Sequence, residues 1–395
     1  MAQRYYQDQP APEEIEQKIA GYTSWLEIDL DNLTHNLKEL RNHVNVPIMA
    51  VVKNNAYGHG LIPVTAHLES QGVEWCMVAK LYEAIKIREA GLKLNILNMD
   101  VLFTPEQYRK VVDLGITQTI YTREDADRLA EAAKKLGKKA RVFVKVDTGL
   151  NRVGVRHSEA AVLIEYVHNL ERVDVLGIFS TFQQNPAMDK EMLAKLLAVD
   201  AELRAKGIKV PIRSMASTDA TFHNPDGWLD MVRPGMSLYG VYPEKKDLKA
   251  PVGLKQVLSL KARIEYVKTV ERGEGVTYWG KYIAPRRMRI GTIHAGFYDG
   301  IPRELANVGR ILVDGRYKSS LGSVSLNHIL VDLEGVEAEK GTVVEIIGRE
   351  GENTISKTAE TAGWMTYSLL NHLNMNTPRV YYKNSEPVAL LDLSN

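Results

Sequence analysis

Short apolar segments alternate with amphipathic segments between residues 48 and 239, and this alternation restricts the possible folds more than any other feature of the sequence. Short apolar runs bounded by turn residues are typical of buried strands, and apolar residues spaced three and four apart are typical of helices. The pattern predicts strands at residues 48–53, 74–79, 94–99, 117–122, 141–147, 173–182, 212–218 and 231–239. Between most of them it predicts helices, at residues 82–90, 105–114, 124–136, 158–169 and 188–206.

Strands and helices that alternate over about 200 residues predict an α/β fold with a (β/α)8 barrel of the TIM type. An open, doubly wound sheet is the competing fold. It is disfavoured because no glycine-rich phosphate-binding loop follows the predicted strand at residues 48–53. A further short strand is expected at residues 25–30, before a helix that reaches Asn42 and has Asp31 as its N-cap.

The pattern changes after Pro251 to short β segments separated by glycine turns. These segments are expected at residues 258–270, 288–293, 310–313, 328–333 and 342–347, with a helix at 359–373 and a last strand at 388–391. They predict a second, mostly β domain. We divide the chain into an N-terminal extension (1–24), a barrel domain (25–245) and a β-rich C-terminal domain (250–395), with the boundary at residues 242–251. Alternatively, the strand at residues 25–30 pairs with the β-rich domain.

Composition and charge restrict the classes of partner. The formal net charge is +1 at pH 7, which argues against nucleic acid or an anionic membrane surface as a partner. No apolar run approaches the ~18 residues of a membrane span. Residues 1–24 lack the basic start and apolar core of a signal peptide, so we expect a cytoplasmic protein. The single cysteine, Cys76, excludes an internal disulfide, and we expect no metal site.

The stretch from Val51 to Gly60, VVKNNAYGHG, carries the first candidate for chemistry. An apolar run ends in Lys53, and two asparagines, a tyrosine and two glycines follow before apolar periodicity resumes at Leu61. This predicts a buried strand, a turn and the start of a helix. Lys53 would lie at the carboxyl end of a strand, where α/β enzymes place their reactive groups. A solvated surface lysine is the alternative for such a residue in isolation.

Two other predicted strands also end in cationic residues. The fifth strand continues into DTGLNR, which ends in Arg152, and a guanidinium matches the two oxygens of a carboxylate. The eighth strand contains Arg233, followed by a Pro-Gly turn whose Gly235 and Met236 offer backbone N–H groups to an anion. In isolation, these segments are equally compatible with a surface arginine and an ordinary turn.

Together these segments resemble the motifs of the alanine racemase family, and the similarity extends from Trp25 to Tyr382. The resemblance implies a barrel followed by a β domain, with pyridoxal 5′-phosphate (PLP) attached to Lys53. The segments GEGVTYWGK (273–281) and GFYDGIPR (296–303) resemble the second signature of the family. It implies that Tyr278 is the catalytic tyrosine and reaches the active site of the other subunit of a homodimer.

The resemblance also implies roles for residues around the cofactor. Arg233 would contact the pyridine nitrogen, and Arg152 and Leu326 would contact the substrate. The expected phosphate-binding residues are Tyr57, Thr218, Gly235, Met236 and Tyr367. In some members of the family, the lysine that matches Lys145 is carbamylated and pairs with the arginine that matches Arg152; pairing with a carboxylate is the alternative.

The departures from the family pattern cluster at the substrate end of the expected site. Thr181 stands where the family has the histidine that supports the catalytic tyrosine, and Ser214 stands where another histidine is common. Phe297 replaces a tyrosine of the substrate entrance, while Leu326 and Asn327 replace methionine and aspartate. The cofactor residues are kept and the substrate end differs, so the resemblance leaves open which amino acid is the substrate.

The sequence therefore predicts a PLP-dependent amino-acid racemase that moves the Cα proton with two bases, Lys53 on one face and Tyr278 on the other. An amino-acid decarboxylase or another enzyme of this fold is one alternative. Decarboxylases of this fold offer glutamate to the ring nitrogen and a cysteine from the β domain, whereas this chain offers Arg233 and has its cysteine in the barrel. A non-catalytic PLP-binding protein is the other alternative; such proteins typically lack the second domain.

Overall fold

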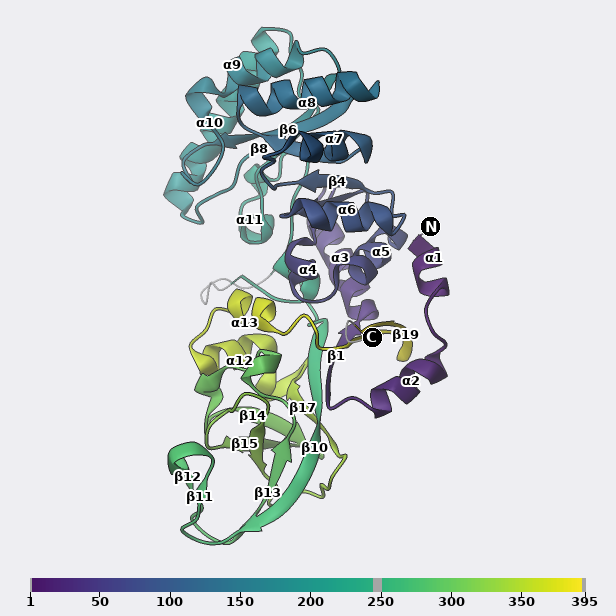
Figure 1. Ribbon diagram of the computed structural model, residues 1–395. Coiled ribbons are helices and arrows are strands. Elements are labelled where there is room, and N and C mark those ends of the chain that lie inside the picture. Colours follow the sequence, from purple (N-terminus) through teal and green to yellow (C-terminus); the bar gives the residue numbers. More distant parts are fainter. Residues whose placement is uncertain (1, 244–250, 393–395) are drawn as a thin grey trace.

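The computed structural model describes residues 2–243 and 251–392 and contains two large sheets, one above the other in Figure 1. The upper part in that view holds the parallel strands and most of the helices, and the lower part is built around the long strand β10. The predicted boundary at residues 242–251 falls mostly on residues 244–250, which lie outside the described residues.

The upper sheet is 8-stranded, with the order β2-β3-β4-β5-β6-β8-β9 and β7 paired with β6. The strands are β2 (Met49–Val51), β3 (Trp75–Val78), β4 (Asn95–Asn98), β5 (Thr117–Ile120), β6 (Ala140–Asp147), β7 (Val155–Arg156), β8 (Val173–Phe179) and β9 (Ile212–Ser214). Val232 pairs with Ile48 and Arg233 pairs with Ser217, so one short segment joins the two ends of the sheet. The predicted TIM-type barrel is confirmed.

The eighth barrel strand is much shorter than the predicted segment 231–239. Only Val232 and Arg233 form bridges, and the chain then enters the 3-10 turn η2 (Met236–Tyr239). Pro234 explains the early end, because proline has no N–H to continue the ladder and its ring fixes the backbone. The prediction of a full strand here was wrong, and the shorter form leaves room for a turn at the carboxyl end of the barrel.

Most helices follow the predicted ranges closely. The helices are α3 (Leu30–His43), α5 (Leu61–Ser70), α6 (Leu81–Glu89), α7 (Pro105–Asp113), α8 (Arg123–Leu136), α9 (His157–His168), α10 (Pro186–Ala205) and α11 (Thr218–His223). Helix α11 was not predicted, and of α5 only the start was. The N-cap of α3 is Asp29, whose side chain accepts a hydrogen bond from Asn32 N at 2.8 Å. Asp31 accepts instead from Asn384 N, so the expectation that Asp31 caps this helix was wrong. None of the described helices is long and apolar enough to span a membrane.

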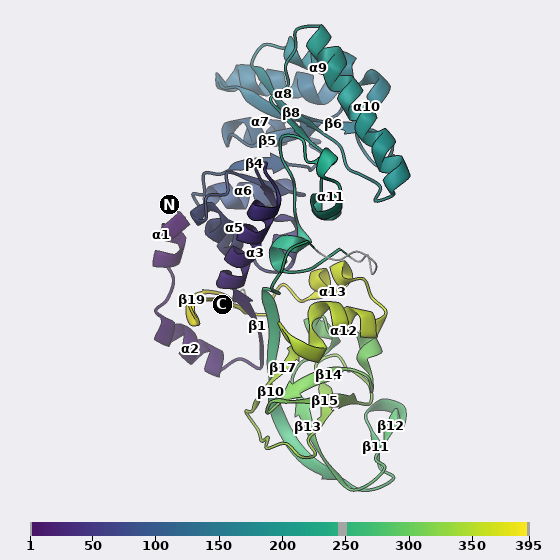
Figure 2. The ribbon, with the colours of Figure 1, turned by 180° about the vertical axis from the view of Figure 1, so that it is seen from behind.

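The lower sheet is 9-stranded, with the order β13-β16-β15-β14-β17-β10-β1-β18-β19. The strands are β1 (Ser24–Asp29), β10 (Leu258–Val270), β13 (Met288–Ile293), β14 (Arg310–Val313), β15 (Arg316–Leu321), β16 (Ile329–Asp332), β17 (Val343–Ile347), β18 (Arg379–Lys383) and β19 (Glu386–Leu391). Strand β1 is antiparallel to β10 and parallel to β18, so the start and the end of the chain meet in this sheet. A separate pair, β11 (Gly275–Val276) and β12 (Tyr282–Ile283), extends from it in Figure 2.

The N-terminal extension and the C-terminal domain differ from the predicted elements in three ways. The helix predicted at 359–373 is two helices, α12 (Ile355–Ala362) and α13 (Thr366–His372), because Gly363 ends the first with a φ of 68°. Strands β15 and β18 were not predicted. The N-terminal extension forms α1 (Ala2–Gln7) and α2 (Pro12–Ala20), and Ile15 of α2 packs with Trp25 and Val380 of the lower sheet.

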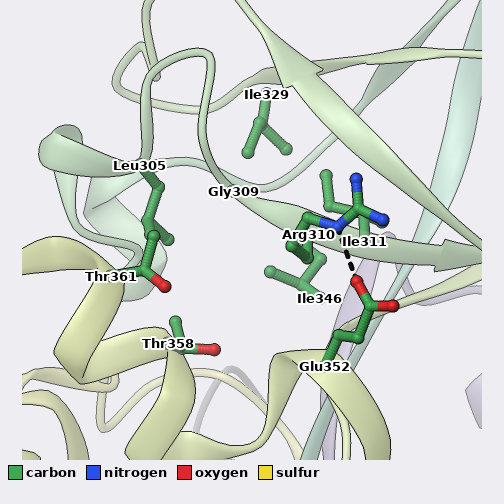
Figure 3. Close-up of a pocket in the computed structure, with 9 residues that line it drawn as sticks. All are labelled: Leu305, Gly309, Arg310, Ile311, Ile329, Ile346, Glu352, Thr358 and Thr361. Carbon is green, nitrogen blue, oxygen red and sulfur yellow. Dashed lines mark hydrogen bonds and ion pairs between the residues drawn. The ribbon is translucent and has the colours of Figure 1, made fainter.

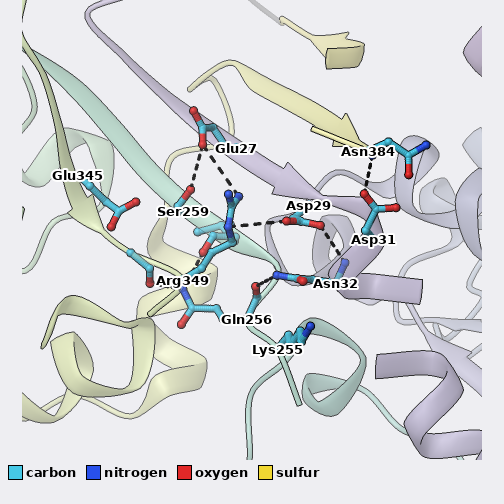
Figure 4. A network of polar contacts seen from close by, with 12 residues as sticks. Glu27, Asp29, Asp31, Asn32, Lys255, Gln256, Ser259, Glu345, Arg349 and Asn384 are labelled. Carbon is cyan, nitrogen blue, oxygen red and sulfur yellow. Dashed lines mark hydrogen bonds and ion pairs between the residues drawn. The ribbon is translucent and has the colours of Figure 1, made fainter. Parts of the chain in front are cut away.

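A polar network fixes the barrel against the lower sheet (Figure 4). Within the lower sheet, Arg349, which follows β17, lies 4.0 Å from a carboxylate oxygen of Glu27 and 3.9 Å from one of Asp29, both in β1. Asn32 of α3 donates to Gln256 O at 2.8 Å, and the Gln256 side chain accepts from Ile355 N at 2.9 Å. Since these bonds join α3, β1 and α12, they hold the α12–α13 pair at a set distance from the barrel.

Candidate active site

The residues after β2 form a left-handed turn that positions Lys53. This turn, α4 (Lys53–Tyr57), has φ values of 55°, 55°, 53° and 52° at Asn54, Asn55, Ala56 and Tyr57. Left-handed backbone costs roughly 1–2 kcal/mol per residue, and asparagine tolerates it better than alanine or tyrosine. The sequence pattern predicted a turn here, and in the structure this turn is left-handed.

A buried glutamate that sequence reasoning did not single out holds this turn in place. Glu83 of α6 accepts hydrogen bonds from Asn55 N, Ala79 N and Lys80 N, each at 3.1 Å. These three hydrogen bonds fix the orientation of the carboxylate and satisfy three backbone donors of the turn and of the start of α6. Glu83 is also a nearby opposite charge for Lys53. Its signal in the sequence is its place three residues after Lys80, in the capping position of the helix.

The second sheet also contacts the turn. Arg379 of β18 donates to Gly58 O at 2.7 Å, and the Tyr381 hydroxyl donates to His59 O at 2.8 Å. A Cβ at Gly58 would lie 2.7 Å from the carbonyl oxygen of Leu370 in α13. The lysine-bearing turn is therefore enclosed between the barrel and the α13–β18 segment, which limits its freedom to move.

A cavity of about 230 Å³ opens at the carboxyl ends of the barrel strands, next to this turn. It is lined by Val51, Lys53, Tyr57, Met77, Met99, Arg152, Phe179, Thr181, Ser217, Thr218, Arg233, Gly235 and Tyr367. Most of the predicted site residues are thus brought together from β2, β6, β9, the short eighth strand and α13. The described residues that line the cavity do not include Met236, Tyr278 or Leu326.

Another hollow, in the β-rich part, is too small to hold a substrate. It has a volume of about 10 Å³ and lies among Leu305, Ile329, Ile346 and neighbouring side chains (Figure 3). Arg310 Nε donates to Glu352 Oε2 at 2.8 Å across one side of it. A volume of this size holds about one water molecule. The cavity at the barrel mouth is therefore the better candidate for the active site.

Lys53 has the electrostatic properties of a reactive amine. Burial and the positive charge of Arg152 lower the pKa of its ammonium group, while Glu83 acts in the opposite direction. A lowered pKa raises the fraction of neutral amine, which is the form that attacks a carbonyl. The geometry thus favours covalent chemistry at Lys53 over the alternative of a solvated surface charge.

Arg233 lies deeper in the same cavity and is only 4% exposed. Its guanidinium donates to Ser180 O at 2.6 Å, to Met215 O at 3.4 Å and to the hydroxyl of Ser214. Burial lowers the pKa of Arg233 to about 10, so the group stays charged at neutral pH. A fixed, permanently charged donor at this depth suits a ligand group that accepts a hydrogen bond without being protonated.

Lys145 is the second buried cationic residue beside the cavity, and it is 3% exposed. Its Nζ donates to Thr181 Oγ1 at 2.8 Å and lies 4.5 Å from the centre of the Phe179 ring. Burial, together with the charges of Arg233 and Arg152, holds the pKa of Lys145 well below its usual value. The hydroxyl of Thr181 is therefore the hydrogen-bond partner of Lys145, rather than a carboxylate.

The opposite end of the cavity is rich in hydroxyl groups. Thr218 Oγ1 accepts from Gly235 N at 2.9 Å. The rings of Tyr57 and Tyr367 lie 6.2 Å apart, and a Cβ at Gly235 would lie 2.7 Å from the Tyr57 hydroxyl. Only glycine allows this close approach. PLP has an aldehyde, a pyridine nitrogen and a phosphate. The cavity offers an amine that can react with the aldehyde, a guanidinium that can donate to the ring nitrogen, and a group of hydroxyls that can bind the phosphate. These residues therefore fit PLP.

Tyr278 lies outside this cavity, in the loop between β11 and β12. Its side chain is 69% exposed, and the flanking residues Thr277 and Trp279 have φ values of 64° and 57°. Thr277 Oγ1 accepts from Ser323 N at 2.7 Å, which ties the loop to the start of the segment that carries Leu326. Strained backbone of this kind persists where the surroundings enforce it, often at functional sites. Phe297 and Leu326 are also exposed.

Comparison with known proteins matches nearly the whole chain. The family described as alanine racemase, N-terminal domain, matches residues 28–243, and the alanine racemase, C-terminal domain, matches residues 257–381. The alanine racemase of Clostridium perfringens is 32% identical over 378 residues, which cover 93% of this chain and 97% of that protein.

Solved structures give the same result. The alanine racemase of Clostridium difficile 630 superposes with a TM-score of 0.90 at 31% identity, covering 94% of this chain and 99% of the other. The histidine racemase of Leuconostoc mesenteroides subsp. sake superposes with a TM-score of 0.85 at 25% identity, covering 92% and 99%. Proteins of this fold therefore include racemases that are named for different amino acids.

Proposed function

The chain belongs to the PLP-dependent alanine racemase family and is an amino-acid racemase, and from this premise we propose that Lys53 and Tyr278 are its two bases. Racemisation removes the Cα proton from one face of the substrate and returns a proton to the other face. It therefore needs a proton-transfer group on each side of Cα. The proposal rests on the separate positions of the two residues: Lys53 lines the cavity, whereas Tyr278 is exposed outside it.

We propose that the cavity holds PLP by the donor set described above. Lys53 would hold the aldehyde carbon, Arg233 the pyridine nitrogen, and Tyr57, Thr218, Gly235, Met236 and Tyr367 the phosphate. When bound, PLP supplies a conjugated electron acceptor that makes the Cα proton acidic. Because Arg233 is charged and can only donate, it keeps the ring nitrogen unprotonated. This moderates electron withdrawal and favours return of a proton to Cα over other reactions.

Two residues of the cavity would act on the substrate. Arg152, in the segment after β6, is available to bind the substrate carboxylate with its planar guanidinium. Lys53 would lie on one face of Cα and could take or return the proton there. Beside the cavity, burial and the charges of Arg233 and Arg152 lower the pKa of Lys145, which disfavours a third positive charge at this site.

Tyr278 serves the second face, and we propose that it comes from another copy of the chain. A loop that is 69% exposed in one chain becomes useful when it enters the cavity of a partner. Two identical sites that exchange this loop imply a homodimer closed by a two-fold axis. Trp279 in the loop is 89% exposed, and Phe297 and Leu326 are exposed elsewhere in the same part of the chain; exposed aromatic side chains are enriched at protein interfaces.

Mixing two inactive variants tests this arrangement. Lys53→Ala and Tyr278→Phe are each expected to be inactive, and Lys53→Ala is also expected to lose the visible absorbance of lysine-bound PLP. Unfolded and refolded together, they should form mixed dimers in which one site has both mutations and the other has neither. Random pairing then restores about one quarter of the wild-type rate. Sedimentation should show a dimer in every sample, and a mixture that stays inactive while dimeric would refute the shared site.

A further inference from the structure

Three potential metal ligands converge on the lower sheet, outside the cavity described above. Glu265, His294 and His328 each offer one ligand atom, and these atoms all lie within 4.8 Å of one another. Glu265 Oε2 lies 2.8 Å from His294 Nδ1, and Glu265 Oε1 lies 3.0 Å from His328 Nε2. The three side chains are partly exposed, so a cation and its water ligands can reach them from solvent.

The sheet brings these residues together although they are far apart in the sequence. Strand β13 lies between β10 and β16, with Ile293 paired to Ile264 on one side and to Ile329 on the other. His294 directly follows β13 and His328 directly precedes β16, so both extend the same row across the strands. The β10–β13 register shifts between Ile264 and Tyr266, so Glu265 is the extra residue of a β-bulge. Bulges commonly re-aim a side chain, here toward the two histidines.

The segments that carry the histidines are held firmly. His328 N donates to Ser325 Oγ at 3.1 Å, and Ser325 N donates to His328 O at 2.9 Å, which closes a tight turn. Phe297 N donates to Ser325 O at 3.0 Å, so the loop after His294 is bonded to the loop before His328. A Cβ at Gly296 would lie only 2.3 Å from Ser325 O, which shows how closely the two loops pack.

We propose that Glu265, His294 and His328 form a binding site for a divalent transition-metal ion of the zinc type. Two imidazoles and one carboxylate, with further positions open to water, are a ligand set that binds Zn²⁺. Ligand atoms on one zinc ion lie roughly 3.4 Å apart, because each metal–ligand bond is about 2.0–2.2 Å. The three atoms therefore need only small side-chain rotations to surround one ion. No metal site was predicted, and the three residues are too far apart in the sequence for their spacing to indicate this cluster.

The competing explanation is a simple cluster of hydrogen bonds in which each histidine binds one carboxylate oxygen. The two explanations differ in what the bound ion would do. A cation would join the loop after His294, which carries Phe297, to the loop before His328, which carries Leu326. It would stiffen the exposed surface beside Tyr278, whereas a hydrogen-bonded cluster would not respond to added metal. The inference does not depend on racemisation.

Zinc titration of the full-length protein, stripped of metal and free of any histidine tag, tests the site. Calorimetry with ZnCl2 should give one site per chain, and Co²⁺ should give visible ligand-field bands that Zn²⁺ abolishes. Loss of second-shell partners alone typically weakens metal binding by about 10- to 100-fold, so His294→Ala, His328→Ala and Glu265→Gln should each weaken it by at least about tenfold. His168→Ala, which removes an exposed histidine of α9, is the matched control and should bind zinc as the wild type does.

The outcomes separate the two explanations without reference to enzyme activity. One equivalent of zinc that is lost in the three cluster variants and kept in the control supports the site. Absence of a saturable site in the wild type would overturn the proposal and leave a hydrogen-bonded cluster. Zinc binding of wild-type strength in all three cluster variants would also overturn it. Circular dichroism of each variant verifies that the fold is intact.

Discussion

At the scale of single residues, three basic side chains in or beside the cavity differ in pKa. Arg233 stays charged because its pKa is lowered only to about 10. Burial lowers the pKa of Lys53 and, more strongly, that of Lys145, and the charges of neighbouring arginines act in the same direction. These differences suit the proposed roles of a fixed charge for Arg233 and a nucleophilic amine for Lys53.

The buried Lys145 predicts a pH dependence of stability. Its folded pKa lies well below the value of about 10.4 in the unfolded chain. Between these two values the unfolded chain binds one more proton, so the free energy of unfolding rises with pH through this window. Lys145→Met should remove this rise and increase the free energy of unfolding at pH 7 by about 1–3 kcal/mol.

Urea denaturation at several pH values between 6 and about 10 measures this effect. The control is Lys268→Met, which changes an exposed lysine of β10. We expect the control to keep the wild-type dependence on pH and Lys145→Met to flatten it. Equal slopes in all three proteins would show that Lys145 is charged in the folded state, for example by carbamylation or by pairing with an acid.

The residues at the substrate end predict an activity that is not limited to alanine. Phe297, Leu326 and Asn327 differ from the family pattern, and one protein of similar structure is a histidine racemase. We expect turnover of at least one other amino acid at a rate comparable with that of alanine. Incubation with single enantiomers and chiral chromatography measures this directly. Alanine turnover far above that of every other amino acid would mean that these substitutions are neutral for specificity.

At the scale of elements, the left-handed turn α4 decides where Lys53 and Tyr57 point. It packs against Leu370 of α13, and Gly58 allows this contact. Gly58→Ala should cost roughly 1–2 kcal/mol for the left-handed backbone and about 1–3 kcal/mol more for the clash. The control is Gly72→Ala, since Gly72 has a similar φ of 74° but its nearest neighbour is 3.8 Å from the added Cβ.

Chemical denaturation measures the stability of both variants, and a titration with PLP measures their affinity for the cofactor. Gly58→Ala should be less stable than Gly72→Ala and should bind PLP more weakly, because its turn carries the lysine. The control should lose stability but keep the wild-type affinity for PLP. Equal stability and equal affinity in both variants would show that the contact with α13 does not hold the turn.

Elements with strong periodicity were predictable, and elements set by contacts from distant segments were not. Most strands of the barrel and the range of β10 follow from local apolar runs, whereas the eighth barrel strand is cut short at Pro234. The winding of α4 does not, because it depends on Glu83 and on the second sheet. Short strands such as β15 have mixed polar sequences and exist because their neighbours pair with them. The site residues were predictable as motifs, whereas Glu83 lies outside any motif.

At the scale of the whole molecule, a single chain contains the cofactor cavity and, well apart from it, the tyrosine loop. The hydrogen bonds from Arg379 and Tyr381 of β18 to the lysine-bearing turn, and the close contact of Gly58 with α13, fix the second sheet against the barrel, so the loop cannot fold back without breaking them. The sequence motifs named Lys53 and Tyr278 as candidates, but a linear sequence carries no information about which chain would supply each one. The proposed racemisation therefore depends on proton transfer by residues of two chains.

Hydrogen exchange at Cα in Tyr278→Phe tests this claim most directly. In D2O the variant should lose interconversion of the enantiomers, with a fall of at least about 10²-fold. It should still exchange the Cα proton of one enantiomer only, the one whose proton faces Lys53. Mass spectrometry and chiral chromatography of the recovered amino acid measure both results. Racemisation at the wild-type rate in Tyr278→Phe, or equal exchange of both enantiomers, would contradict the two-base assignment.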